Sequence, residues 1–393
     1  MENKTHQIEK EIKAVLTVFS STKNPNEEYR AFRKIKTIAR KSGFITKENR
    51  QLFWKALLNK SIERNTLDTI KNIKREHDIG RNYAVFSIEK DQGVVDKDTP
   101  RCIFHQYKRS DTKSKIKVNP KILQKSIKDF LKNKKIYSYY QGYLDIAVYF
   151  RVLFYQKETS KNSDYYLKFL DLFTNLFVLD YISPLEEGKN LYEIVIKVLN
   201  SFINIRNHTL YTYLQENVFI LYSVISWVLT FLTHNVSNFD IICRIFDYLI
   251  VSPPYTIFII SALILIDSFE TISEEDLDED AATKISLAFK SIELNDLDYD
   301  NIINRTEYIL THNELDIAKI INQYKDDLYW TFNNSINGID IVTRNNSVEY
   351  QVMQFKKFLR KNTIGRVKLN HIELSSYIPM MLYIIIVILI FTV

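Results

Sequence analysis

The scarcity of glycine and proline constrains this chain more than any other feature of its sequence. Each occurs only seven times in 393 residues, well below average usage. Turns depend on these two residues, so the chain has few signals for reversing its direction. Apolar residues make up 46% of the sequence, which is enough to bury a large helical core. We therefore predict an all-α fold of long helices joined by short polar loops.

Charge and cysteine content exclude several classes of protein. The formal net charge of +6 is modest and spread along the chain, which gives little support to a nucleic-acid-binding role. The two cysteines, Cys102 and Cys243, have neither the spacing of a zinc site nor that of a disulfide framework. This usage fits a reducing compartment. The polar N-terminus, M-E-N-K-T-H-Q-I-E-K, does not resemble a signal peptide.

The C-terminal run has the opposite character. Residues 377–393 carry no charge, and this length lies at the lower end of what a membrane-spanning helix requires. A basic segment precedes the run, and such flanks stay on the cytoplasmic side and attract anionic lipids. Without an anchor, the same segment would be an ordinary solvated linker. We predict a C-terminal transmembrane anchor helix with a basic neck that contains Lys356, Lys357, Arg360, Lys361, Arg366 and Lys368.

Two internal apolar runs, 218–233 and 255–266, are shorter than a membrane span. Runs of this length are usually buried core helices. We therefore favour a single anchor over a protein that crosses the membrane several times.

Two polar stretches carry the candidate chemistry. Residues 136–146 read I-Y-S-Y-Y-Q-G-Y-L-D-I, in which the rare Gly142 follows Gln141, a side chain that both donates and accepts hydrogen bonds. Upstream, residues 94–101 read V-V-D-K-D-T-P-R and place Asp98 three residues before Arg101. Because residues 91–100 are polar and end in a proline, we predict that a loop or a helix start presents Arg101.

This constellation is not a self-contained active site. The seven histidines are scattered, and the sequence has no H-E-x-x-H, G-x-S-x-G, Walker or G-x-G-x-x-G motif. An arginine near an aspartate and a glutamine beside a glycine supply neither a nucleophile nor a general base. Taken singly, Arg101 would be a surface ion-pair residue and Gln141 a loop amide. Taken together, they suit a protein that completes the active site of a partner.

The two stretches resemble motifs of a known family. The segment with Val95, Asp98 and Arg101 is similar to the I-x-x-D-x-x-R motif of TBC-domain Rab GTPase-activating proteins. Residues 139–145, Y-Y-Q-G-Y-L-D, are similar to the Y-x-Q-G motif of the same family. Cys102 stands where that family often has threonine.

Three further segments resemble the same family in the same order. Residues 50–54 match its R-x-x-x-W motif, residues 227–231 resemble its W-x-x-x-x segment, and residues 244–247 resemble its R-x-W-D segment, with phenylalanine in place of tryptophan. The resemblance covers roughly residues 30–325. Each motif alone is weak, but five in order identify the chain as a member of this family with a TBC-type helical domain.

The resemblance implies roles for individual residues. Arg101 would be an arginine finger and Gln141 a glutamine finger, both supplied to a Rab GTPase that carries GTP and Mg²⁺, so the chain needs no cofactor of its own. Asp98 would orient the arginine or its loop, and Tyr139 would pack the glutamine loop. Arg50 has a structural role on this interpretation. The supporting residues are Asp98, Tyr139, Gly142, Asp145, Arg50 and Trp54.

The resemblance also implies an organisation and a location. We predict an N-terminal helical extension at 1–29, a TBC domain at 30–325, a linker with a basic neck at 326–374 and an anchor at 377–393. The Y-Y-Q-G-Y-L-D-I form and the anchor are similar to the tail-anchored branch of the endoplasmic reticulum, which acts on a Rab of early secretory traffic. The early Golgi and mitochondria are alternative locations. The alternative functions are a non-catalytic Rab-binding tether and a membrane-shaping helical protein.

Overall fold

The computed structural model describes residues 2–64, 88–104, 118–132, 137, 139–154, 165–182, 189–273, 280–328 and 331–332. The chain divides into two compact units, Met1–Thr343 and Arg344–Val393, and all described residues belong to the first. Every regular element in these ranges is a helix, which confirms the predicted all-α fold.

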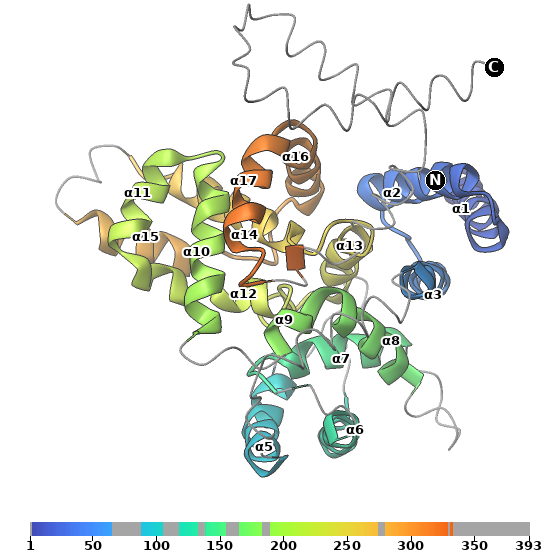
Figure 1. Cartoon of the computed structure of the whole chain (residues 1–393), viewed down its shortest axis with the longest axis horizontal. Helices are drawn as coiled ribbons and strands as arrows, with labels where there is room; N and C mark the ends of the chain where they lie inside the picture. The colour runs from blue at the N-terminus through green and yellow to red at the C-terminus, as the bar shows by residue number, and fades with distance from the viewer. Residues whose placement is uncertain are drawn as a thin grey trace, which may run out of the picture. The chain divides into compact units, whose positions relative to one another are not determined.

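Figure 1 shows the described helices in their order along the chain. The first half contains α1 (Glu2–Ser21), α2 (Pro25–Lys41), α3 (Lys47–Arg64), α5 (Ile88–Phe104), α6 (Pro120–Lys132), α7 (Tyr143–Phe154) and α8 (Tyr165–Phe173). The second half contains the π-helical turn η1 (Thr174–Val178), α9 (Leu179–Ile182), α10 (Leu191–Asn204), α11 (His208–Glu216), the 3₁₀ helix η2 (Val218–Ser223), α12 (Ile225–Leu229), α13 (Phe239–Leu249), α14 (Thr256–Phe269), α15 (Ala281–Lys290), α16 (Tyr299–His312) and α17 (Glu314–Tyr324).

Asparagine side chains mark many of the helix starts in this glycine-poor chain. The side chains of Asn24, Asn119, Asn190, Asn207 and Asn238 each accept a hydrogen bond from a backbone N–H in the first turn that follows. Such a cap stabilises a helix by about 1 kcal/mol. Asn119 precedes α6 in this way, and Asn238 rather than its neighbour Ser237 caps α13.

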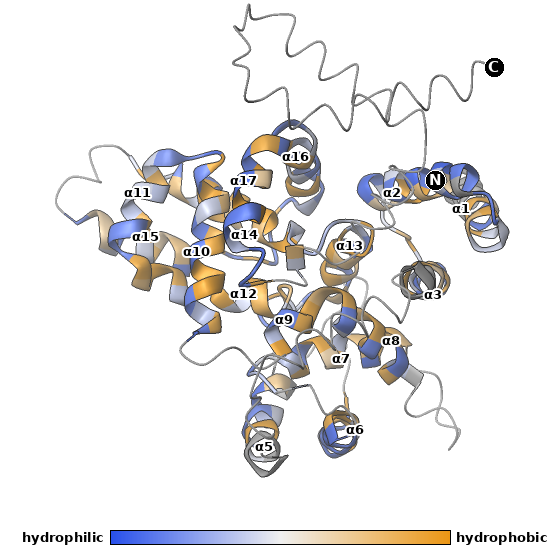
Figure 2. Ribbon diagram, in the orientation of Figure 1, coloured by the Kyte–Doolittle hydropathy of each residue, from blue (hydrophilic) through white to orange (hydrophobic). Residues whose placement is uncertain are grey.

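The core is built around helices that are apolar on all sides. Every residue of α7 is buried, and α14 is buried along nearly its whole length. Figure 2 shows that hydrophobic residues predominate on α7. The apolar run at 255–266 is thus a core helix, as predicted. Aromatic rings fill the space between α3, α7 and α13, where Trp54 stacks on Phe246 with ring centroids 5.8 Å apart and Tyr149 lies 4.4 Å from Phe246.

Two predicted features of the helices are wrong. Residues 91–100 lie inside α5, because burial of Val95, Asp98 and Cys102 on one face outweighs the loss of a backbone hydrogen bond at Pro100. The run at 218–233 is not one helix, since η2 and α12 follow α11 as separate short pieces. It ends in two left-handed residues, Phe231 and Leu232.

Among the described residues, no helix combines the length and apolar character that crossing a membrane requires. The anchor predicted at 377–393 and its basic neck lie outside the described residues. These predictions therefore stay predictions, as does the predicted division of the chain into four segments.

Candidate functional site

The two candidate fingers lie on elements that pack against each other. Arg101 is in the last turn of α5, and Gln141 is in the tight turn that leads into α7. Helix α5 packs on both α6 and α7 (Figure 1). Both side chains are exposed, and within the described part of the chain neither makes a hydrogen bond or an ion pair. Arg101 is therefore presented by a helix and not, as predicted, by a loop or a helix start.

Asp98 joins the two elements. It lies one turn before Arg101 on α5, and its carboxylate is buried, with 6% of the residue exposed. Its Oδ2 accepts a hydrogen bond from the backbone N–H of Gly142, at 3.0 Å, and another from the hydroxyl of Tyr139. The carboxylate thus fixes the residues on both sides of Gln141 to the helix that carries Arg101.

Tyr139 serves as a permanent donor in this arrangement. Burial, together with the neighbouring charge of Asp98, raises the pKa of Tyr139 well above its ordinary value. The phenol consequently stays protonated and donates to the carboxylate. The sequence predicts that Tyr139 packs the glutamine loop, but it does not predict this hydrogen bond. Only the folded chain brings Tyr139 and Asp98 together.

Gly142 has a conformation that favours glycine for two separate reasons. Its φ angle is +102°, a region that residues with a side chain rarely adopt. A Cβ atom at this position would also lie 2.7 Å from Cγ2 of Thr230. The close approach of the turn to Thr230 explains why one of seven glycines stands here.

Asp145 makes a second connection between the same elements. It lies in the first turn of α7 and is buried. The Sγ–H of Cys102, the residue after Arg101, donates to its carboxylate, and burial followed by this charge raises the pKa of the thiol well above its ordinary value. His234 Nδ1 lies 2.9 Å from Asp145 Oδ2. No sequence motif marks His234, so its contact with Asp145 was not predicted.

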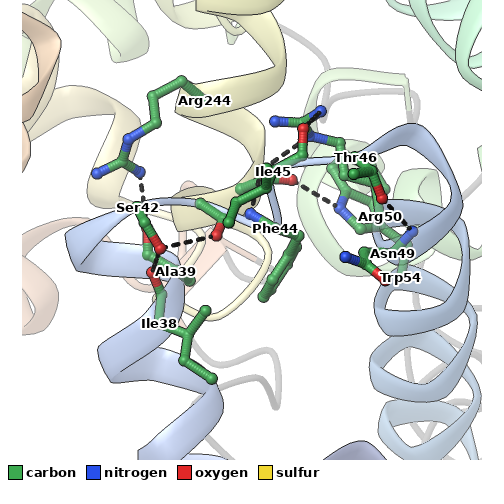
Figure 3. A network of polar contacts seen from close by, with 12 residues as sticks. Ile38, Ala39, Ser42, Phe44, Ile45, Thr46, Asn49, Arg50, Trp54 and Arg244 are labelled. Atoms are coloured by element: carbon green, nitrogen blue, oxygen red, sulfur yellow. Dashed lines mark hydrogen bonds and ion pairs between the residues drawn. The ribbon is translucent and has the colours of Figure 1, made fainter. Parts of the chain in front are cut away.

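Arg50 and Trp54 lie elsewhere, around the fully buried Asp247 of α13. Asp247 Oδ2 accepts from Arg50 Nε and from the backbone N–H of Phe44, both at 2.8 Å, and Oδ1 accepts from Trp54 Nε1 at 3.3 Å. Figure 3 shows these donors arranged along α3 and the turn before it. Burial raises the pKa of Asp247, while the Arg50 charge and these hydrogen bonds act in the opposite direction. The cluster holds α13 against α3.

Arg244, one turn before Asp247, holds the end of α2 in a similar way. Its guanidinium donates to the carbonyl oxygen of Ala39, at 2.6 Å, and to that of Arg40 (Figure 3). Its Nε pairs with Asp300 at 2.7 Å. Two charged residues of α13 thus supply hydrogen-bond partners for backbone groups: Arg244 for the carbonyls at the end of α2, and Asp247 for an N–H in the turn before α3.

The described residues hold no group of histidine, cysteine and acidic side chains that could bind a metal ion. The two exposed candidate side chains are a cation, Arg101, and an amide, Gln141. Such a pair can stabilise negative charge and orient a water molecule, but it cannot break a bond without a partner.

Comparison with known proteins gives the family. Residues 47–272, more than half of the chain, match the model of the Rab-GTPase-TBC domain. The chain is also 27% identical over 241 residues to the GTPase-activating protein gyp10 of Schizosaccharomyces pombe. That match covers 59% of this chain and 56% of gyp10, so the chain spans little more than half of the relative's length. On the family match and the helical fold, the chain belongs to the Rab-GTPase-TBC domain family.

Proposed function

We propose that this protein accelerates GTP hydrolysis by a Rab-family GTPase, with Arg101 as an arginine finger and Gln141 as a glutamine finger. Family membership supports this activity, and so does the printed name of gyp10 as a GTPase-activating protein. The observation that carries the residue assignment is the pair of exposed side chains on backbone that Asp98 holds together.

The chemistry of phosphoryl transfer explains the arginine. Negative charge spreads over the oxygens of the transferring phosphoryl group in the transition state. A guanidinium placed in the partner's site stabilises this charge and raises the rate of hydrolysis by about 10³–10⁵-fold. Arginine is always charged and presents a planar fork of donors. Arg101 suits this role because it is exposed, whereas the helix behind it is buried through Val95, Asp98 and Cys102.

The glutamine supplies the other requirement, an oriented water. The amide oxygen of Gln141 accepts from the attacking water, and its NH₂ group donates to the phosphoryl oxygen. GTP and Mg²⁺ arrive with the GTPase, and the metal neutralises charge between the phosphates. This chain contributes two side chains and the backbone that fixes their separation.

Location is a further part of the proposal. We place the protein on the cytosolic face of the endoplasmic reticulum or early Golgi, with a Rab of early secretory traffic as its partner. The uncharged run at 377–393 and the cations before it support an anchor and contact with lipid. Removing residues 372–393 is expected to abolish sedimentation with membranes. A truncated protein that still sediments after a carbonate wash would contradict the single anchor.

The catalytic assignment is tested by single-turnover GTP hydrolysis with a panel of purified Rabs. Arg101→Ala and Gln141→Ala are expected to lower the turnover rate far more than the affinity, because both contacts form in the transition state. The double variant is expected to be little worse than the poorer single variant, since the two act as a unit. The second candidate, a non-catalytic tether, predicts binding to the Rab without acceleration.

A further inference from the structure

A short turn, residues 229–234, lies directly behind the glutamine loop. The hydroxyl of Tyr140 donates to the carbonyl oxygen of Leu229 at 2.8 Å. Gly142 approaches Thr230 so closely that a Cβ atom would not fit between them. His234 closes the turn with its bond to Asp145. The chain around Gln141 therefore touches this turn on both sides of the glutamine.

The turn has a conformation that is costly for its sequence. Phe231 and Leu232 have φ angles of 51° and 66°, a left-handed region that is rare for bulky residues. Both side chains are fully buried, and the ring of Phe231 packs edge-on against Phe173 with centroids 5.4 Å apart. The core therefore fixes the turn, and this strained backbone supports the loop that carries Gln141.

We propose that His234 is a positioning residue for the glutamine finger. Its Nδ1–H donates to Asp145, which lies four residues after Gln141 in the first turn of α7. Asp145 in turn accepts from Cys102, the neighbour of Arg101. Through this one carboxylate, His234 fixes the start of α7 relative to the last turn of α5. The inference rests on the proposed function, because it gives His234 a task in the same site.

The geometry makes the inference selective. The bond uses Nδ1, the ring nitrogen nearer the backbone, and the amide nitrogen of an asparagine occupies nearly the same place. The amide of a glutamine reaches one bond further and does not. His234→Asn is therefore expected to keep the contact with Asp145, whereas His234→Gln and His234→Ala lose it. His312, an exposed histidine on α16, offers a matched control.

The experiment measures single-turnover GTP hydrolysis by the cognate Rab over a range of activator concentrations. His234→Ala and His234→Gln are expected to lower the maximal rate about tenfold, the size of effect that losing a charge-assisted hydrogen bond produces, with the half-saturating concentration unchanged. His234→Asn and His312→Ala are expected to match the parent. Hydrogen exchange is measured in parallel, and His234→Ala is expected to accelerate it at residues 139–146 but not in α14.

The outcomes separate this inference from the proposed function. One outcome would overturn the role of His234: His234→Ala has the turnover rate and the hydrogen exchange of the parent, while Arg101→Ala is inactive. The assignment of Arg101 and Gln141 as fingers would then be unaffected. Failure of His234→Asn to restore the rate, with faster exchange throughout the protein, would reduce His234 to a general structural residue. If the parent accelerates no Rab, the proposed function fails, and exchange at residues 139–146 alone decides whether His234 holds the loop.

Discussion

Asp98 and Asp247 are two buried carboxylates in nearly the same setting. Each accepts a backbone N–H at a tight turn, from Gly142 in one case and Phe44 in the other, and each accepts from an aromatic side chain, Tyr139 or Trp54. Each turn also contains a left-handed glycine, since Gly43 and Gly142 have φ angles of +65° and +102°.

The two settings differ in their arginine. Arg50 is largely buried and paired with Asp247, whereas Arg101 is exposed one turn away from Asp98 and makes no ion pair within the described residues. The first cluster uses its arginine to neutralise a buried charge. The second holds its turn without the arginine and leaves that cation available to a partner. The same residue types therefore build a structural cluster in one place and the proposed functional site in the other.

The largest effect on stability is expected at Asp247. Asp247→Ala leaves the guanidinium of Arg50 buried without its partner, a change that costs about 3–5 kcal/mol. Chemical denaturation followed by circular dichroism measures the loss. The control is Asp300→Ala, which removes the exposed partner of Arg244 and is expected to cost less than about 1 kcal/mol. Equal losses would contradict the structural role of the Asp247 cluster.

Asp98→Ala tests the other carboxylate and is expected to act on turnover. The substitution leaves the N–H of Gly142 and the hydroxyl of Tyr139 without their acceptor, which loosens the glutamine turn. We expect GTP turnover to fall about 10–100-fold, equivalent to roughly 1.4–2.7 kcal/mol. Arg101→Ala, measured beside it, is expected to lose more. Equal losses in two well-folded variants would make Asp98 itself essential to the active arrangement.

Gly142→Ala is expected to cost about 1–3 kcal/mol of stability, through the left-handed backbone and the contact with Thr230. The double variant Gly142→Ala with Thr230→Ser removes the methyl group in the way and is expected to recover part of the loss. Thermal unfolding of both variants checks this. No recovery in the double variant would assign the whole cost to the backbone angle.

The smallest effect concerns pH. The hydrogen bond to Asp145 raises the pKa of His234 above 6.5, its ordinary value. The unfolded chain loses this proton at lower pH than the folded chain. The contribution of the His234–Asp145 bond to the free energy of unfolding is therefore fully present below about pH 6.5. It disappears as the pH rises through the folded-state pKa. Asp145 and Asp98 are the charged groups that act on the ring.

Because His234 is partly exposed, this contribution is expected to stay below about 1 kcal/mol. Unfolding free energies measured between pH 6 and pH 8 check it, with His234→Asn expected to flatten the decline. His208→Asn, an exposed histidine on α11, is the control. A decline that is identical in the parent and in His234→Asn would assign the pH dependence to other groups.

The sequence was sufficient for the parts of the fold that local rules decide. Few glycines and prolines predicted helices, and the core helix at 255–266 followed from the length of its apolar run. The motifs singled out Arg101 and Gln141 as the candidate fingers, and this assignment stays a prediction. It did not reveal that α5 continues through Pro100, because the burial of Val95 and Cys102 that stabilises the helix depends on distant helices.

Contacts between distant segments were beyond prediction for the same reason. The bond from Tyr139 to Asp98 spans 41 positions, and the bond from His234 to Asp145 spans 89. The left-handed pair Phe231 and Leu232 contradicts local propensity and exists only because the core accepts both side chains. Such violations of local rules gather at the turn behind the proposed site.

One measurement tests the contrast between the two arginines most directly. Arg50→Ala and Arg101→Ala are compared for the free energy of unfolding and for single-turnover GTP hydrolysis by the cognate Rab. Arg101→Ala is expected to lose at least about 10³-fold in turnover while its stability stays within about 0.5 kcal/mol of the parent. Arg50→Ala is expected to lose about 3–5 kcal/mol of stability, while its folded fraction keeps near-parental turnover. Near-parental turnover in Arg101→Ala would contradict the catalytic role of Arg101 and favour the alternative function, a non-catalytic Rab-binding tether.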